Sequence, residues 1–240
     1  MSNWTCGRDG RVAWLSFDRP PDDQVRFDDL VDLRGALTAL APDEDVSVVV
    51  LGSARPGGFI GHADRGEIKA MREGGPGRLE EWLTTLLAIE DLPQPVVAAV
   101  RGPARGGGCE IALACTFRIA GPQASFCQLE IDRGAMPGAG ATQRLPRLIG
   151  AGRAAHMIMT GRAVGAAEGL AMGLVDAVIE GPDVAAGMAR WAGELASKPR
   201  ASLVGIKRAL LAAQRLPMAE GLRLEQRLFH EVLTGKGERA

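Results

Sequence analysis

The chain has 240 residues, of which 46% are hydrophobic and 24% are charged, so it can bury a core and is not a disordered chain. Its 28 basic and 29 acidic residues leave a net charge of −1, which argues against a nucleic-acid binder that depends on bulk positive charge. Tyrosine is absent, so no tyrosine can serve as acid, base or nucleophile.

The cysteines and histidines are scattered, at Cys6, Cys109, Cys115, Cys127, His62, His156 and His230. No CxxC pair occurs, which excludes a zinc framework of that spacing and argues against a disulfide scaffold. No run approaches the 18 apolar residues that a membrane-spanning helix needs. The N-terminal segment also lacks the pattern of a signal peptide, which is a basic start followed by an apolar core. These features predict a cytoplasmic protein with no metal site and no membrane span.

The first elements alternate between strands and helices. A strand is predicted over 12–17 and a helix over 28–40, where leucines recur at a spacing of three and four residues. The β-branched run 46–51 and the run 96–100 are typical of strands buried on both faces. An amphipathic helix over 79–92 lies between these two runs.

The later elements are shorter and then purely helical. They are a helix at 109–116, strands at 117–120, 124–127 and 175–179, and helices at 184–195, 203–211 and 222–233. The Gly181-Pro182 step separates the two patterns. The sequence therefore predicts an α/β core over 1–181 that carries any active site, and a C-terminal helical region over 182–240.

Three consecutive glycines, Gly106, Gly107 and Gly108, lie between a predicted buried strand and a predicted helix. Glycines there allow a sharp turn that points backbone N–H groups outward at a helix N-terminus, where they can stabilise a developing oxyanion. The plain alternative is a tight turn without a chemical role. A phosphate site is disfavoured, because neither GxxxxGK[ST] nor the GxGxxG spacing is present.

Two glutamates stand near these glycines in the sequence. Glu110 falls in the first turn of the predicted helix, where an acidic residue also simply favours the helix dipole. Glu130 lies between turn-rich segments, where its plain alternative is a solvated loop residue. Their separation of twenty residues indicates nothing by itself.

Five segments carry the functional signal when they are taken together. They are 59–64 (FIGHAD), 101–110 (RGPARGGGCE), 126–130 (FCQLE), 136–145 (MPGAGATQRL) and 160–179 (TGRAVGAAEGLAMGLVDAVI). In this order they resemble the enoyl-CoA hydratase/isomerase, or crotonase, superfamily over roughly residues 10–233. The likeness is imperfect, since Arg101, Leu129 and Ala141 stand where that family has Asn, Pro and Gly.

The resemblance implies a site for the thioester of an acyl-CoA. The backbone N–H groups of Ala63 and Gly107 would form the oxyanion hole that binds the thioester oxygen. The substrate would be lined near that carbonyl by Ala63, Asp64, Arg65, Gly66 and Gly107. His62 beside this site is expected to be a surface-loop histidine, because the family gives its position no chemical role.

Glu110 and Glu130 would be the acid/base pair. The resemblance is greatest to the two-glutamate enoyl-CoA hydratase branch, in which both carboxylates hold the water that adds to a trans-2-enoyl-CoA and gives a 3-hydroxyacyl-CoA. The 3,2-enoyl isomerases generally keep only the second acid, and Gly138 replaces the further acid of the dienoyl isomerases. We expect a hydro-lyase of fatty acid metabolism. An isomerase or other enolate chemistry, and a non-catalytic protein that binds acyl-CoA or a partner, remain as alternatives.

The implied fold is a spiral of ββα turns with two roughly perpendicular sheets and C-terminal helices that form a homotrimer or a hexamer built from two trimers. No metal or redox cofactor is implied, since coenzyme A enters as part of the substrate. The segment 19–30 lacks the family's Asn-Ala pair, and the chain stops before the family's final charged helix. Charged Arg105, Asp132 and Arg133 replace residues that are usually apolar, and the last two either face away from the cleft or indicate a polar substrate.

Overall fold

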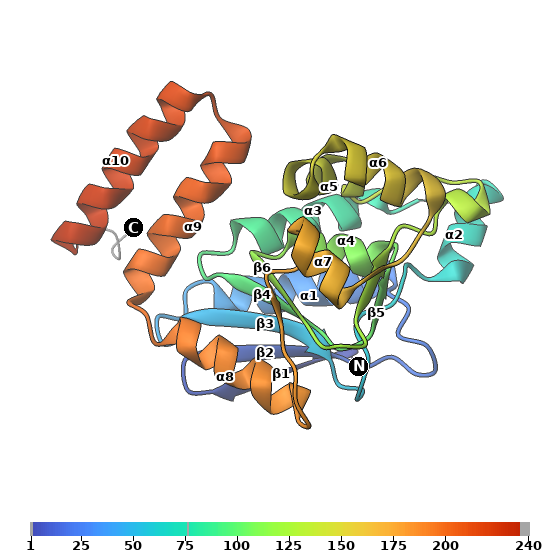
Figure 1. The fold of residues 1–240 in the computed structure, drawn as a ribbon, viewed down its shortest axis with the longest axis horizontal. Coiled ribbons are helices and arrows are strands. Elements are labelled where there is room, and N and C mark those ends of the chain that lie inside the picture. Colours follow the sequence, from blue (N-terminus) through green and yellow to red (C-terminus); the bar gives the residue numbers. More distant parts are fainter. Residues whose placement is uncertain (1, 76, 236–240) are drawn as a thin grey trace.

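The computed structural model describes residues 2–75 and 77–235 and is built around a six-stranded sheet (Figure 1). The strand order is β1-β2-β3-β4-β6-β9; β1 and β2 form an antiparallel hairpin, and every other neighbouring pair is parallel. The six strands are β1 (Trp4–Asp9), β2 (Val12–Phe17), β3 (Val48–Ser53), β4 (Val96–Val100), β6 (Phe117–Ala120) and β9 (Ala177–Val178).

A second sheet of three short strands has the order β5-β7-β8. These strands are β5 (Pro103–Arg105), β7 (Ser125–Cys127) and β8 (Val164–Gly165). After β4 the chain enters β5 and then a helix, and after β6 it enters β7 and then a short 3-10 turn. The expected succession of strand, strand and helix is therefore present, and it places the end of β7 beside the end of β5.

The helices enclose the large sheet from both faces (Figure 1). They are α1 (Phe27–Leu40), α2 (Arg65–Arg72), α3 (Leu79–Asp91), α4 (Gly107–Ala114), α5 (Ala141–Ile149), α6 (Ala151–Thr160), α7 (Ala166–Met172), α8 (Val184–Ala196), α9 (Arg200–Arg215) and α10 (Met218–Thr234), with the 3-10 turn η1 (Ile131–Arg133). Among the described residues, no helix combines the length and apolar character needed to cross a membrane.

The sequence of β3 and β4 explains why they are central. All residues of both strands are buried, as the continuous apolar runs predict. Val49 and Leu51 point into the core with α1, α3 and α4, whereas Val48 and Val50 pack on the opposite face with Met188 of α8. Because successive side chains of a strand point to opposite faces, β3 contributes to both hydrophobic cores. The candidate site lies on the face of the sheet that is covered by α4.

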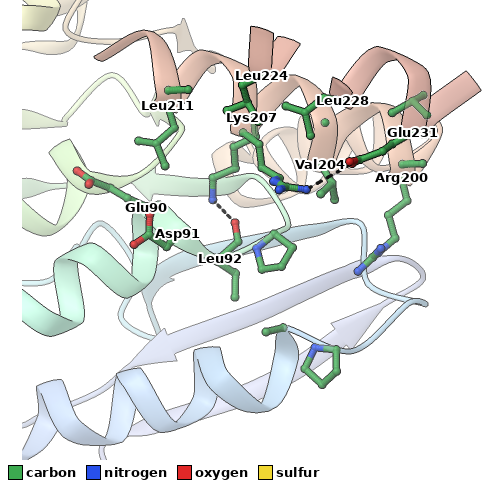
Figure 2. Close-up of a pocket in the computed structure, with 18 of the residues that line it drawn as sticks. Glu90, Asp91, Leu92, Arg200, Val204, Lys207, Leu211, Leu224, Leu228 and Glu231 are labelled. Carbon is green, nitrogen blue, oxygen red and sulfur yellow. Dashed lines mark hydrogen bonds and ion pairs between the residues drawn. The ribbon is translucent and has the colours of Figure 1, made fainter. Parts of the chain in front are cut away.

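Helices α9 and α10 form a hairpin beyond this layered core (Figure 1), and one buried lysine attaches it to the core. Lys207 of α9 is 7% exposed, and its Nζ donates to the carbonyl oxygens of Leu92 (2.6 Å), Gln94 (2.9 Å) and Ile89 (3.3 Å). Figure 2 shows the side chain directed at Leu92. These oxygens lie at the C-terminus of α3, where a helix leaves its last carbonyls unpaired. Burial lowers the pKa of Lys207 to about 8.

We expect Lys207→Met to lower the free energy of unfolding by at least about 2 kcal/mol, because several buried carbonyls lose their donor at once. Urea denaturation at fixed protein concentration measures the change. Exposed Lys198, just after α8, provides the matched control, since Lys198→Met should change stability by no more than about 0.5 kcal/mol. Equal effects of the two substitutions would contradict the role given to Lys207.

Candidate active site

The glycine-rich turn lies where its sequence predicts, between β5 and the start of α4. Gly106 has φ 48° and ψ −120°, in the region that glycine adopts without strain, and its N–H donates to Cys127 O of β7 (2.9 Å). Gly107 is the first residue of α4, so its N–H has no acceptor within the helix. The turn therefore presents a backbone donor at the positive end of the helix dipole.

The segment around Ala63 is pressed against this turn. His62 O accepts from Val25 N (2.9 Å), and Asp64 N donates to Val25 O (2.8 Å). Backbone groups alternate in direction along an extended segment, so the N–H of Ala63 between them points away from Val25. At Gly108 there is no room for a side chain, because an added Cβ would lie 1.9 Å from Gly61 O. This close packing holds the extended segment against the start of α4.

Glu110 is buried on α4, one turn after the glycines. The residue is 3% exposed, and its Oε1 accepts from the backbone N–H groups of Ala139 (2.8 Å) and Ala141 (3.0 Å). Burial raises the pKa of Glu110, whereas the two amides and the charge of Arg144 oppose the rise by favouring the ionised carboxylate. The sequence could not indicate these donors, since they lie about thirty residues further along the chain.

Glu130 follows β7 and begins the turn η1. It is half-buried, and its Oε2 is enclosed without a hydrogen-bond partner in the described part of the chain. Its Oε1 lies over the glycine turn, 2.5 Å from the position that a Cβ on Gly106 would occupy. Burial raises the pKa of Glu130 to about 7, and the negative charge of Glu110 adds to the rise. The fold thus brings the two glutamates close enough to influence each other.

The other predicted substrate residues begin α2, and they differ in how their side chains are used. Asp64 caps the helix: its Oδ1 accepts from Gly66 N (2.9 Å) and Glu67 N (3.1 Å). Its Oδ2 pairs with Arg19 (3.0 Å) and Arg26 (3.2 Å). The carboxylate of Asp64 is therefore engaged inside the protein, where it orders the segment that contains Ala63.

His62 is half-buried, which differs from the surface position expected for it. Its Nδ1 lies 2.7 Å from Ala63 O, and Arg65 Nε lies 3.3 Å from its Nε2. Burial lowers the pKa of His62, and Arg65 and Arg133 add to the decrease. The ring is therefore a neutral neighbour of Ala63 at physiological pH.

The three charged residues at positions that are usually apolar in the family, Arg105, Asp132 and Arg133, lie in different surroundings. Asp132 lies beside Gly161 at the end of α6, with its Oδ2 2.9 Å from the position that a Cβ on Gly161 would occupy. Arg133 lies close enough to Glu130 to lower its pKa, and its carbonyl accepts from Arg72 of α2. Arg105 ends β5 with an exposed side chain.

Comparisons with known proteins point to one family. The family model described as enoyl-CoA hydratase/isomerase matches residues 7–239. A short-chain-enoyl-CoA hydratase of Clostridium acetobutylicum is 32% identical over 100% of this chain and 92% of its own length. A crotonyl-CoA hydratase of Syntrophomonas wolfei is 35% identical over 80% of this chain and 74% of its own.

A solved structure gives the same result for the fold. The crystal structure of an enoyl-CoA hydratase from Bacillus anthracis superposes with a TM-score of 0.88 at 32% identity, covering 97% of this chain and 92% of that one. The predicted α/β spiral with a helical C-terminal region is confirmed. The chain belongs to the enoyl-CoA hydratase/isomerase family, the crotonase superfamily that its five segments resemble.

Proposed function

We propose that this protein is an enoyl-CoA hydratase that adds water to a trans-2-enoyl-CoA and gives a 3-hydroxyacyl-CoA, or catalyses the reverse dehydration. The observation that carries the proposal is the pair Glu110 and Glu130, the first buried and the second half-buried, which lie in different surroundings beside the glycine turn at the start of α4. The relatives named crotonyl-CoA hydratase and short-chain-enoyl-CoA hydratase support the same substrate class.

The thioester oxygen would accept from the N–H groups of Ala63 and Gly107. Water addition to the β-carbon turns the thioester into an enolate, so negative charge gathers on this oxygen in the transition state. Each fixed donor of this kind contributes about 2.7–4 kcal/mol to transition-state stabilisation. The donors need no rearrangement, because Gly108 and Asp64 hold their two segments in place.

The different surroundings of the two glutamates support different catalytic roles for them. Glu110 accepts two amide hydrogen bonds and lies near Arg144, which favours its carboxylate, so it acts as the base that takes a proton from the attacking water. Glu130 has a buried oxygen with no partner among the residues that the structure describes, and its pKa is raised, so it carries the proton that goes to the α-carbon. The pair holds one proton before and after the reaction, which permits both directions.

No metal or redox group takes part in this scheme, and coenzyme A arrives with the substrate. We further propose that the chain forms a homotrimer or a pair of trimers through its last two helices. This is supported by the large apolar side chains that the hairpin exposes, namely Ile206, Leu210, Met218, Leu222, Phe229 and Leu233. Light scattering on the purified protein tests the assembly.

The function is tested by mixing the protein with crotonyl-CoA and following the absorbance of the conjugated enoyl thioester. Loss of absorbance together with a product heavier by one water is the expected result. A product of unchanged mass would instead indicate double-bond isomerisation. Tight binding without turnover across a panel of chain lengths, by folded protein, would contradict the proposal and favour a binding role.

The pKa of Glu130 gives an expected pH dependence. Below about pH 7 Glu130 keeps its proton, and above it the pair loses the proton that must reach the α-carbon. We therefore expect kcat/KM for hydration to fall about tenfold per pH unit above roughly pH 7, where kcat/KM reports the free enzyme. Initial rates with crotonyl-CoA from pH 5 to 9 measure this fall of kcat/KM on the alkaline side. A kcat/KM that stays level through pH 9 would contradict this role of Glu130.

A further inference from the structure

The loop 139–141 holds Glu110, but little of the protein supports its outer side. The loop supplies both amide hydrogen bonds to the carboxylate, and it leads into α5 through Gly140, whose φ is 109°. On its outer side is a cavity of about 480 Å³, whose wall also includes Leu83 and Leu86 of α3 and Leu211 of α9. Ala141, at the end of the loop, is fully buried in the core, so polar contacts are left to fix the outer side of the loop.

Arg144 of α5 provides those contacts. Its Nη1 donates to Ala139 O (2.8 Å), and its guanidinium lies against Gly140, where a Cβ would be 2.1 Å from Nη1. Its Nε donates to Glu90 Oε1 of α3 (2.6 Å). Arg144 and Glu90 have side chains only 15% and 17% exposed, so this ion pair is shielded from most of the solvent.

Glu90 continues the chain of contacts to the C-terminal hairpin. Its second oxygen, Oε2, pairs with Arg215 at the end of α9 (2.6 Å), which also pairs with Asp91 (2.6 Å). Glu90 and Asp91 lie at the end of α3 beside α9 (Figure 2). A continuous series of hydrogen bonds thus runs from Glu110 through the loop, Arg144 and Glu90 to α9.

We propose that Arg144, held by Glu90 and through it by Arg215, is a positioning residue that keeps the 139–141 loop aligned and so orients the carboxylate of Glu110. The inference rests on the proposed function, because it is Glu110 as base whose orientation matters. It also means that the docking of the C-terminal hairpin affects the active site through one ion-pair chain. The positive charge of Arg144 acts in the same sense, since it favours the ionised form of Glu110.

Replacing Arg144 tests the inference by its effect on rate, KM and pH dependence. Arg144→Met should lower kcat with crotonyl-CoA about 10- to 100-fold while KM changes less than about threefold, since the oxyanion donors are untouched. The acidic limb of kcat/KM should move to higher pH, because Glu110 loses a nearby positive charge. Arg144→Lys should return that limb toward its wild-type position, since the charge is kept, but recover kcat only in part. Arg215→Met should also lower kcat, by about threefold.

Arg147→Met is the matched control. Arg147 lies on the same helix and is exposed, and within the described part of the chain it donates only to Gln143 O of its own helix. We therefore expect kcat and the acidic limb of the pH profile to stay at wild-type values. Wild-type behaviour of Arg144→Met, folded by circular dichroism, would overturn the inference. If Arg144→Met does not fold, Arg144→Lys and Arg215→Met decide the matter, and wild-type kcat in both would overturn the inference.

A titration that needs no turnover separates this inference from the proposed function. In protein labelled with carbon-13 at the glutamate carboxyl, the Glu110 signal is assigned by its absence from Glu110→Gln. We expect its midpoint to rise in Arg144→Met and to stay unchanged in Arg147→Met. An unchanged midpoint in both variants would overturn the inference even where hydration is confirmed. A raised midpoint in a protein that hydrates no enoyl-CoA would support the positioning and refute the function.

Discussion

Replacing Glu110 or Glu130 by glutamine is expected to lower kcat for hydration of crotonyl-CoA by about 10²–10⁴-fold, because each substitution removes a group that transfers a proton. Glutamine keeps the size of the side chain, and its Oε1 can still accept from Ala139 and Ala141 at position 110. The oxyanion donors are untouched as well. The loss should therefore appear in kcat, while KM changes little.

The two variants should also differ from each other in stability. Glu110→Gln leaves the amide hydrogen bonds of the loop in place, and Glu130→Gln removes a carboxylate whose ionised form is disfavoured by burial, as its raised pKa shows. We expect Glu130→Gln to unfold at a temperature no lower than the wild type. Glu194→Gln, on the exposed face of α8, is the control for charge removal and should keep full activity. Wild-type kcat in either active-site variant would refute the acid/base assignment.

The sequence predicted β2, β4 and β6 at their observed bounds, and it predicted β3 two residues too early, at 46–51 instead of 48–53. The runs in β3 and β4 contain only residues that suit the interior, so their pattern needs no knowledge of neighbours. β1 was missed, because five of its six residues are exposed and its pairing with β2 alone makes it a strand. The predicted strand 175–179 is reduced to Ala177–Val178, since only these residues pair with β6.

Helix α2 was missed for a related reason. No helix was predicted over Arg65–Arg72, because Ile68 and Met71 are its only large apolar residues and none of its residues is buried. Its stability comes from the cap that Asp64 provides and from the ion pairs of Asp64 with Arg19 and Arg26. Residues about forty positions away supply those partners, which no local pattern can reveal.

The candidate site shows the same limit. Local sequence correctly indicated the glycine turn, because φ and the helix start depend on neighbouring residues. The proximity of Glu110 and Glu130 depends on the pairing of β5 with β7, so spacing alone was uninformative and only the resemblance to a family suggested it. Arg144 lay within a recognised segment, but its contact with Glu90 requires α3 and α5 to be packed together. The conformation of the glycine turn was thus readable from the local sequence, whereas the chemical surroundings of the two carboxylates were not.

Gly108→Ala is expected to be the most damaging single-methyl substitution near the site. The added Cβ would lie 1.9 Å from Gly61 O and 2.1 Å from Ile60 O, and both atoms belong to backbone that cannot rotate away. Overpacking of this kind should lower the free energy of unfolding by more than about 3 kcal/mol. Thermal melting of the variant against the wild type measures the loss.

Protein that still folds must separate α4 from the 60–63 segment, and this separation moves the N–H groups of Ala63 and Gly107 apart. Because oxyanion donors act over a few tenths of an ångström, we expect kcat to fall by about 10²–10³-fold in that fraction. Gly193→Ala in α8 is the control: its Cβ meets no atom within 4 Å, so it should keep full activity and gain about 0.5–1 kcal/mol of helix stability. A Gly108→Ala protein with wild-type melting and rate would show that the contact between the glycine turn and the Ala63 segment is not what builds the oxyanion hole, and the site would then have to form in another way.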